Sequence, residues 1–305
     1  MRISYRLLKE LKKPAHRKEY GLAVIEGVRL VTDAIKSRVE LTAVFVSNGF
    51  IKQNISKNVS ELLKVSGYEP VVLSDSLFAA VCDTKTPQGI LAVIKMTGYK
   101  LEDLMGQNQT GHIKTQPESA GISENENIQQ EGSGAYRQFV VLDGVSDPGN
   151  AGSVIRTAEA AGFTGVIMSN GCADLYSPKT LRAAMGSALR LPVVQGVDIK
   201  YAVSQFKEVG IKVIAAAPDA NKSCYEADMS LDIALLIGSE AFGLSMEVIE
   251  LCDEKVCIPM QGQTESLNAG LAAGILMYEA LRQRVYVGAC PTSHGRPETV
   301  TPTDE

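Results

Sequence analysis

The sequence predicts an α/β protein of two domains, the second of which contains a parallel sheet. The chain has 305 residues, which is long for one ordinary domain. Short apolar runs alternate with helix-like segments on both sides of a polar stretch, a pattern typical of helices that cover a parallel sheet. We therefore expect a smaller α/β domain over residues 1–100, a flexible linker over 101–137, a parallel-sheet domain over 138–288 and a disordered tail over 289–305.

The smaller domain is predicted from alternating helical and apolar segments. Strand-like runs lie at residues 20–27, 41–47, 71–73 and 90–96, and helical patterns lie at 28–35 and 56–66. Glycine turns at Gly27 and Gly89 separate some of these segments.

The linker and the tail are predicted from composition. Residues 106–134 are polar and contain almost no large apolar side chain, so they cannot bury enough surface to offset the entropy of ordering. Residues 291–305 contain three prolines and several threonines, which is typical of a terminal tail.

The larger domain contains short apolar runs of the kind that form strands buried on both faces. These runs lie at residues 139–142, 165–168, 213–217, 233–237 and 256–258. Helical patterns lie at 153–161, 178–185, 202–208, 246–251 and 266–283. Ligands of such sheets bind beyond the carboxyl ends of the strands, so the segments that follow these runs are where a site is expected.

The charge of the chain is unevenly distributed. The net charge of −5 argues mildly against a nucleic-acid partner. The first twenty residues nevertheless hold two acidic and seven basic side chains, the latter being Arg2, Arg6, Lys9, Lys12, Lys13, Arg17 and Lys18. A basic arm of this kind can reach phosphate, although the solvated surface of a helix explains it equally well.

The cysteines and the apolar segments indicate the compartment. The closest cysteines, Cys252 and Cys257, have no second pair or histidine beside them, so buried reduced thiols are favoured over a zinc site. No signal-peptide core follows Met1, and no apolar run is long enough to span a membrane. We expect a cytoplasmic protein without bound metal.

Three segments carry the functional information. The apolar run 139–142 leads into a turn rich in Gly, Pro and Asp, and then into a helix that carries Asn150 and Arg156. An Asn at a helix entry, followed by an Arg one to two turns later, indicates a polar or anionic ligand. The other two segments are LIGSEAFGLS at 236–245 and IPMQG at 258–262, which leads into ESLN at 265–268.

Together these three segments resemble the signature of the SpoU-type RNA ribose 2′-O-methyltransferases, in the wider SPOUT group. The resemblance implies a deep trefoil knot in the parallel-sheet domain, S-adenosyl-L-methionine as cofactor, and a homodimer. Residues 26–31 and 84–90 resemble parts of the small ribosomal-protein-like domain that precedes many of these enzymes and binds RNA. Taken alone, they are glycine turns between regular elements.

The resemblance also implies the cofactor-binding positions. In this family, main-chain groups hold the cofactor at positions that match Ala217, Gly238, Glu240, Ile258, Met260 and Leu267. The apolar side chains of Ile258, Met260 and Leu267 suit the walls of an adenine pocket. Glu240 can equally be a carboxylate that favours a helix entry.

The polar set expected at the reacting ribose is Asn150, Arg156, Ser266 and Asn268. None of the three histidines lies in a motif, and a guanidinium loses its proton only above about pH 12. We therefore expect Arg156 to grip a phosphate or ribose and stabilise the developing alkoxide, while Ser266 and Asn268 orient the 2′-hydroxyl. The simpler interpretations are helix caps for Asn150 and Ser266, and a surface charge for Arg156.

The expected RNA-binding residues are basic. They are Lys12, Lys13, Arg17, Arg29, Lys179 and Arg182. The last two follow Ser177 and Pro178, which are typical of a helix start, and an exposed helical face explains these two cations as well as RNA does.

The sequence therefore predicts an S-adenosylmethionine-dependent RNA ribose 2′-O-methyltransferase. Ribosomal RNA, of the 23S type, is favoured over transfer RNA because of the separate front domain. A non-catalytic RNA-binding module on the same fold stays an alternative. A nicotinamide-dependent oxidoreductase is disfavoured, because no G-x-G-x-x-G turn follows any predicted strand.

Overall fold

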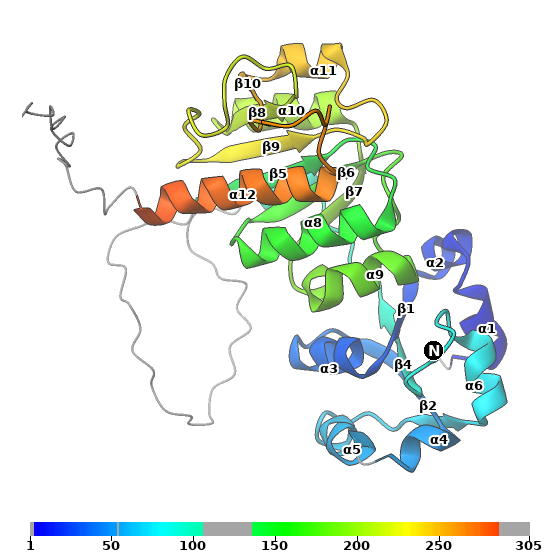
Figure 1. Cartoon of the computed structure of the whole chain (residues 1–305). Coiled ribbons are helices and arrows are strands. Elements are labelled where there is room, and N and C mark those ends of the chain that lie inside the picture. Colours follow the sequence, from blue (N-terminus) through cyan, green and yellow to red (C-terminus); the bar gives the residue numbers. More distant parts are fainter. Residues whose placement is uncertain (1–2, 54, 106–135, 287–305) are drawn as a thin grey trace, which may run out of the picture.

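The computed structural model of this chain describes residues 3–53, 55–105 and 136–286. Its strands form two sheets, one of four strands in the order β1-β4-β2-β3 and one of six in the order β10-β8-β9-β5-β6-β7 (Figure 1). Every strand pair of the six-stranded sheet is parallel. The expected α/β class with a parallel sheet is confirmed, while the knot stays a prediction.

The front part of the chain is a mixed sheet with short helices. Its strands are β1 (Leu22–Glu26), β2 (Leu41–Ser47), β3 (Val71–Leu73) and β4 (Ile90–Lys95). Its helices are α1 (Tyr5–Glu10), α2 (Pro14–Tyr20), α3 (Val28–Lys36), α4 (Asn48–Ile51), α5 (Ile55–Val65) and α6 (Asp75–Val81). The sequence analysis missed α1, α4 and α6. Each begins after a serine, Ser4, Ser47 or Ser74, whose hydroxyl accepts a hydrogen bond from a backbone N–H of the first turn.

The parallel sheet consists of β5 (Gln138–Leu142), β6 (Gly165–Ser169), β7 (Val193–Val197), β8 (Lys212–Ala216), β9 (Ile233–Ile237) and β10 (Glu254–Val256). The accompanying helices are α7 (Leu101–Met105), α8 (Pro148–Ala160), α9 (Pro178–Ala184), the 3-10 helix η1 (Met185–Leu189), α10 (Ile199–Glu208), α11 (Met246–Leu251) and α12 (Ala269–Tyr286). Strand β7 was missed because Gln195 and Gly196 interrupt its apolar run.

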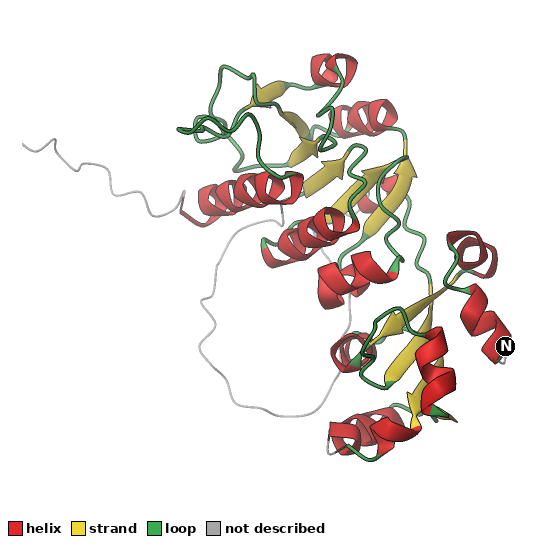
Figure 2. Ribbon diagram, turned by 45° about the vertical axis from the view of Figure 1, so that its right-hand side comes forward, coloured by secondary structure: helices red, strands yellow, loops and turns green. Residues whose placement is uncertain are grey.

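Helices cover both faces of this sheet (Figure 2). Along β5, Val140 and Leu142 belong to the core that contains buried residues of α8 and α12. The alternate residues Phe139 and Val141 belong to the core on the other face, with buried residues of α7, α10 and α11. This alternation follows from the two-residue period of a strand and explains why β5 is apolar throughout.

Helix α7 corrects part of the predicted linker. Residues 101–105 were expected to be flexible, yet Leu101, Leu104 and Met105 are buried in the core beside Phe139. A Cβ atom on Gly165 would lie 2.7 Å from Leu104 Cδ2, so α7 sits directly on β6. The rest of the predicted linker up to residue 135, and the predicted tail, lie outside the described residues.

The two parts of the chain meet at α9 and the segment before it. The Arg17 guanidinium forms an ion pair with Asp174, with Nη2 2.5 Å from Oδ2. The Tyr176 hydroxyl accepts a hydrogen bond from Thr97 N and donates one to Thr97 O. Figure 1 shows α9 between α8 and the front part. Within the described ranges, no helix is long and apolar enough to span a membrane.

Candidate active site

A cavity of about 310 Å³ lies at the carboxyl ends of β8, β9 and β10. Its lining includes all six positions expected to hold a cofactor: Ala217, Gly238, Glu240, Ile258, Met260 and Leu267. Ser266 also lines it. Other lining residues were not predicted. Pro218, Cys257 and Ala272 lie outside the three motifs, and Phe242 lies within the segment 236–245 but was not assigned to the site.

Gly238 is required by the protein's own backbone. A Cβ atom at this position would lie 2.1 Å from the carbonyl carbon of Gly243 and 2.3 Å from Leu244 N. The turn between these residues is closed by two hydrogen bonds, from Ser239 N to Gly243 O (3.2 Å) and from Gly243 N to Ser239 O (2.9 Å). The absence of a side chain at Gly238 therefore makes room for the backbone of Gly243 and Leu244. The turn that this allows holds Glu240 at the cavity.

The three sequence motifs meet at the edge of the cavity. Asn150 Nδ2 donates a hydrogen bond to Glu240 Oε1 (2.6 Å), and Asn268 Nδ2 donates one to Asn150 Oδ1 (2.9 Å). These residues come from α8, from the turn after β9 and from the segment before α12. Glu240 and Asn268 are exposed and Asn150 is half-buried, so the network lies at the surface of the protein.

The helix caps differ from the simpler interpretations offered by the sequence. Asp147, not Asn150, caps α8, because its Oδ1 accepts a hydrogen bond from Asn150 N (2.9 Å). Before α12, Asn268 Oδ1 accepts from Leu271 N (3.2 Å), so Ser266 is not the cap. The hydrogen bond from Asn150 N, followed by the Lys179 ammonium, lowers the pKa of Asp147.

Arg156 lies away from this network. It follows Asn150 by six positions on α8, a rotation of about 240° that places the two side chains on different faces. Its side chain is exposed, does not line the cavity and makes no hydrogen bond or ion pair with any described residue. The structure therefore brings Asn150, Ser266 and Asn268 to the cavity, and leaves Arg156 on the solvent face of α8.

The basic residues expected to contact RNA fall into three groups. Arg17 is only 3% exposed, and its Nη1 donates to Leu11 O (3.0 Å) and Lys12 O (2.8 Å). The prediction that Arg17 contacts a phosphate is therefore wrong. Lys12 donates to Cys82 O (2.8 Å), and Lys179 and Arg182 pair with Asp147 and Asp83. Lys13 and Arg29 are exposed and make no such contact with the described residues.

Few ionisable side chains line the cavity in the described part of the chain. Glu240 is the one carboxylate in its described lining, and no histidine lines it. Among the described residues, no group of three potential metal ligands comes together.

Comparison with known proteins assigns both parts of the chain. The SpoU rRNA Methylase family model matches residues 137–278, and the MRM3-like substrate binding domain model matches residues 5–92. The chain is 32% identical to the 23S rRNA (guanosine(2553)-2′-O)-methyltransferase RlmP of Bacillus subtilis, over 88% of this chain and 92% of that protein. It is 29% identical to an uncharacterized tRNA/rRNA methyltransferase of Synechocystis, over 91% of this chain and 90% of that protein.

A solved structure supports the same relationship. The SpoU methyltransferase AviRb of Streptomyces viridochromogenes, in complex with the cofactor AdoMet, superposes with a TM-score of 0.73. It is 26% identical, and the match covers 92% of this chain and 98% of that chain.

Proposed function

This chain belongs to the SpoU rRNA methylase family, and we propose that it transfers a methyl group from S-adenosylmethionine to a ribose 2′-hydroxyl of ribosomal RNA. The observation that carries the proposal is the hydrogen-bonded set Asn150, Glu240 and Asn268 at the edge of the cavity beyond β8 and β9. It joins the three motifs of the sequence at the place where a parallel sheet binds its ligand.

The cavity fits the cofactor in size and chemistry. Its volume falls within the range of small-molecule sites, about 300–1,000 Å³. Ile258, Met260 and Leu267 provide apolar walls for an adenine, and Ala217 and Gly238 complete the lining at the ends of β8 and β9. When bound, S-adenosylmethionine supplies an electrophilic sulfonium methyl group.

The polar residues would position the ribose. Ser266, which lines the cavity, and Asn268 would orient the 2′-hydroxyl, and Asn150 holds Asn268 through its side-chain carbonyl. Precise alignment of the hydroxyl oxygen with the methyl group is a large part of the catalytic requirement. Arg156, on the neighbouring solvent face of α8, would hold a phosphate of the bound RNA and favour negative charge on the attacking oxygen.

Ribosomal RNA is favoured over transfer RNA as the substrate. The front part matches a substrate-binding domain model, and the Bacillus subtilis relative is named as a 23S rRNA methyltransferase. RNA contacts through Lys13 and Arg29 fit the exposure of these side chains. The proposal places the enzyme in the cytoplasm, where its cysteines stay reduced.

We also infer a homodimer. Leu271, Tyr278 and Val285 are about half exposed and lie seven residues apart on α12, so they share one face of that helix. Phe242, beside the cavity, is 93% exposed. An exposed apolar surface of this kind is typical of a protein interface, and it lies next to the proposed active site.

Calorimetry with candidate cofactors tests the proposal. S-adenosylmethionine and S-adenosylhomocysteine should bind to the purified protein, and NAD should not. Binding of NAD without S-adenosylmethionine would contradict the proposed chemistry and favour an oxidoreductase.

A further inference from the structure

A second cavity, of about 350 Å³, lies between the front part of the chain and α9. The front part lines it with Arg29, Thr84, Thr86 and Gln88, and the larger domain lines it with Arg182 and Met185. It shares no lining residue with the proposed cofactor cavity. We refer to it as the junction cavity.

The two arginines make the junction cavity suitable for an anionic ligand with hydrogen-bond acceptors. Arg29 is exposed and makes no hydrogen bond or ion pair with any described residue. Arg182 Nη2 pairs with Asp83 Oδ2 at 2.7 Å, while its Nη1 is buried and has no hydrogen-bond partner among the described residues. A buried N–H without an acceptor is unfavourable, so a ligand oxygen at this position would be stabilised.

The acidic residue of the lining is hydrogen-bonded by the protein itself. Glu26 accepts hydrogen bonds from Asp83 N (2.9 Å) and from the Thr84 hydroxyl, so the protein's own donors occupy both carboxylate oxygens. Gln88 Oε1 accepts from Val28 N (2.8 Å), which fixes that side chain and leaves its amide NH₂ as a donor.

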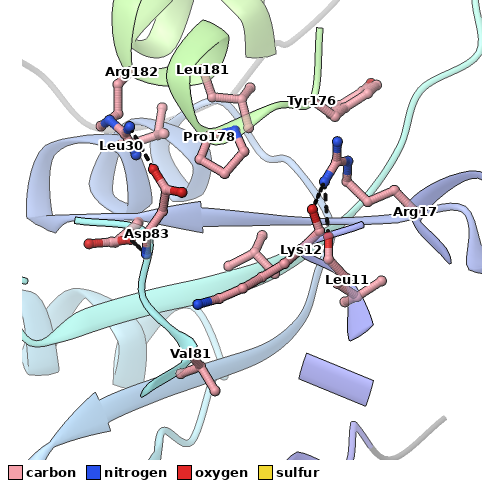
Figure 3. A pocket seen from close by; sticks show the side chains of 12 residues that line it. Leu11, Lys12, Arg17, Leu30, Val81, Asp83, Tyr176, Pro178, Leu181 and Arg182 are labelled. Atoms are coloured by element: carbon pink, nitrogen blue, oxygen red, sulfur yellow. Dashed lines mark hydrogen bonds and ion pairs between the residues drawn. The ribbon is translucent and has the colours of Figure 1, made fainter. Parts of the chain in front are cut away.

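The remaining wall of the junction cavity is apolar. Leu30, Leu181 and Met185 line it. Leu30, Leu181 and the Arg182–Asp83 pair also line an adjacent pocket, which Figure 3 shows. An apolar wall beside cations and amide donors is the combination that binds an unstacked nucleotide, with its base on the wall and its phosphate at an arginine.

A polar surface connects the junction cavity with the proposed active site. Lys179, one turn before Arg182 on α9, pairs with Asp147 (3.1 Å), which in turn accepts the hydrogen bond from Asn150 N. Helices α8 and α9 are in close contact, since a Cβ atom on Gly152 would lie 2.7 Å from the carbonyl oxygen of Thr180. One RNA strand can therefore pass from Asn150, over the start of α9, to Arg29.

We propose that the junction cavity binds one nucleotide of the RNA substrate, separate from the nucleotide that is methylated. The proposal rests on the proposed function for the class of ligand. It assigns the phosphate to Arg29 and Arg182, and the base to the wall formed by Leu181 and Met185.

Two variants with a matched control test this proposal. Arg29→Ala removes the free cation, Thr86→Phe fills the cavity without changing its charge, and Lys64→Ala removes an exposed cation of α5 in the same domain. The probe is a transcript of large-subunit ribosomal RNA, and its affinity is measured at several salt concentrations without cofactor. Methyl transfer gives KM and kcat separately, and calorimetry gives cofactor affinity.

The expected results differ between the variants. Arg29→Ala should weaken RNA binding and reduce the salt slope of the affinity by about 1, because one phosphate contact is lost. Thr86→Phe should weaken binding about tenfold or more through loss of the base contact, with an unchanged salt slope. Both should raise KM for RNA more than they lower kcat, and Lys64→Ala should change neither quantity.

Two outcomes would overturn the proposal. One is wild-type RNA affinity in both cavity variants, and the other is an equal loss in Lys64→Ala, which would indicate a diffuse charge effect. If Thr86→Phe also fails to bind the cofactor, that variant is misfolded. The RNA affinity of Arg29→Ala then tests the proposal alone. A wild-type protein that binds RNA but transfers no methyl group would refute the proposed function. The RNA affinities of the variants could still be compared, because they are measured without cofactor.

Discussion

Single side chains set the chemistry of the proposed active site. Asn150, Glu240 and Asn268 are separated by 90 and 118 residues along the chain, yet two hydrogen bonds join them. Asn150 uses both side-chain polar atoms in this network, whereas Glu240 uses one carboxylate oxygen and keeps the other available. Arg156 contributes differently, since a guanidinium with no partner among the described residues is free to pair with a phosphate.

Replacing Arg156 or Asn268 should separate transfer from cofactor binding. Neither side chain is assigned to the adenine, so Arg156→Ala and Asn268→Ala should keep most of the cofactor affinity. The single-turnover rate of methyl transfer should fall about 100- to 1,000-fold, as is typical when a donor to developing charge is removed. Arg156→Lys should recover little of that rate, because an ammonium lacks the planar fork of donors.

The control for this prediction is Lys57→Ala, which removes an exposed cation of α5. It should transfer methyl groups at the wild-type rate. A rate for Arg156→Ala close to that of the control would reduce Arg156 to a surface charge.

Gly238 and Gly262 provide a matched pair for testing the turn after β9. Gly238→Ala should abolish cofactor binding, because its Cβ atom would lie 2.1 Å from the carbonyl carbon of Gly243 and displace the turn that holds Glu240. Gly262→Ala should bind normally, because nothing lies within 4 Å of the added carbon. Calorimetric titration measures both, and equal affinities in the two variants would show that the turn does not shape the pocket.

At the scale of helices and strands, the apolar runs were the reliable signal. Strands β5, β6 and β9 were predicted close to their observed bounds because all their residues are buried. Helix α8 begins five residues before the predicted start at residue 153. The residues Asp147 and Pro148 are typical of a turn, but proline is also favoured in the first turn of a helix. Helix α7 was not predicted, because it has only five residues and lies directly before the polar stretch that begins at residue 106.

The contacts between distant elements could not be predicted from the sequence. The sequence predicted five of the six strands of the parallel sheet, and it placed the three motifs at the carboxyl edge of that sheet. The hydrogen bonds between the motifs depend on side-chain positions that no local pattern specifies. Arg17 is the clearest case, because its place in a basic arm suggested RNA while its ion-pair partner lies 157 residues away.

The cap of α8 should make stability depend on acidic pH. The pKa of Asp147 is lowered in the folded protein, so its contribution is present above the pKa of the unfolded chain and is lost as pH falls through the folded value. Asp147→Asn keeps a capping oxygen but cannot titrate. The free energy of unfolding of the wild type should therefore fall relative to that of Asp147→Asn as pH drops below about 4.

Urea unfolding between pH 7 and the acidic limit of reversible folding measures this difference. Parallel pH profiles for the two proteins would show that the ionised carboxylate contributes nothing to the cap.

At the scale of the whole molecule, the RNA surface that we propose spans two docked parts of the chain. The buried ion pair of Arg17 with Asp174 and the hydrogen bonds of Tyr176 with Thr97 hold the front part against the larger domain. The cofactor cavity lies at the carboxyl ends of β8, β9 and β10, and Leu181 and Arg182 of α9 line the junction cavity. In the function that we propose, this arrangement would let the front part bind an RNA segment at a fixed distance from the ribose that is methylated.

The central claim is that this protein methylates ribose in ribosomal RNA, and one transfer experiment tests it most directly. The purified protein is incubated with S-adenosylmethionine labelled in the methyl group and with either unmethylated ribosomal RNA or transfer RNA, and the product is digested to nucleosides. We predict label in a single 2′-O-methylnucleoside from large-subunit ribosomal RNA, and none with Asn268→Ala. Label on a base, label in transfer RNA alone, or no transfer by a protein that binds the cofactor would contradict the account.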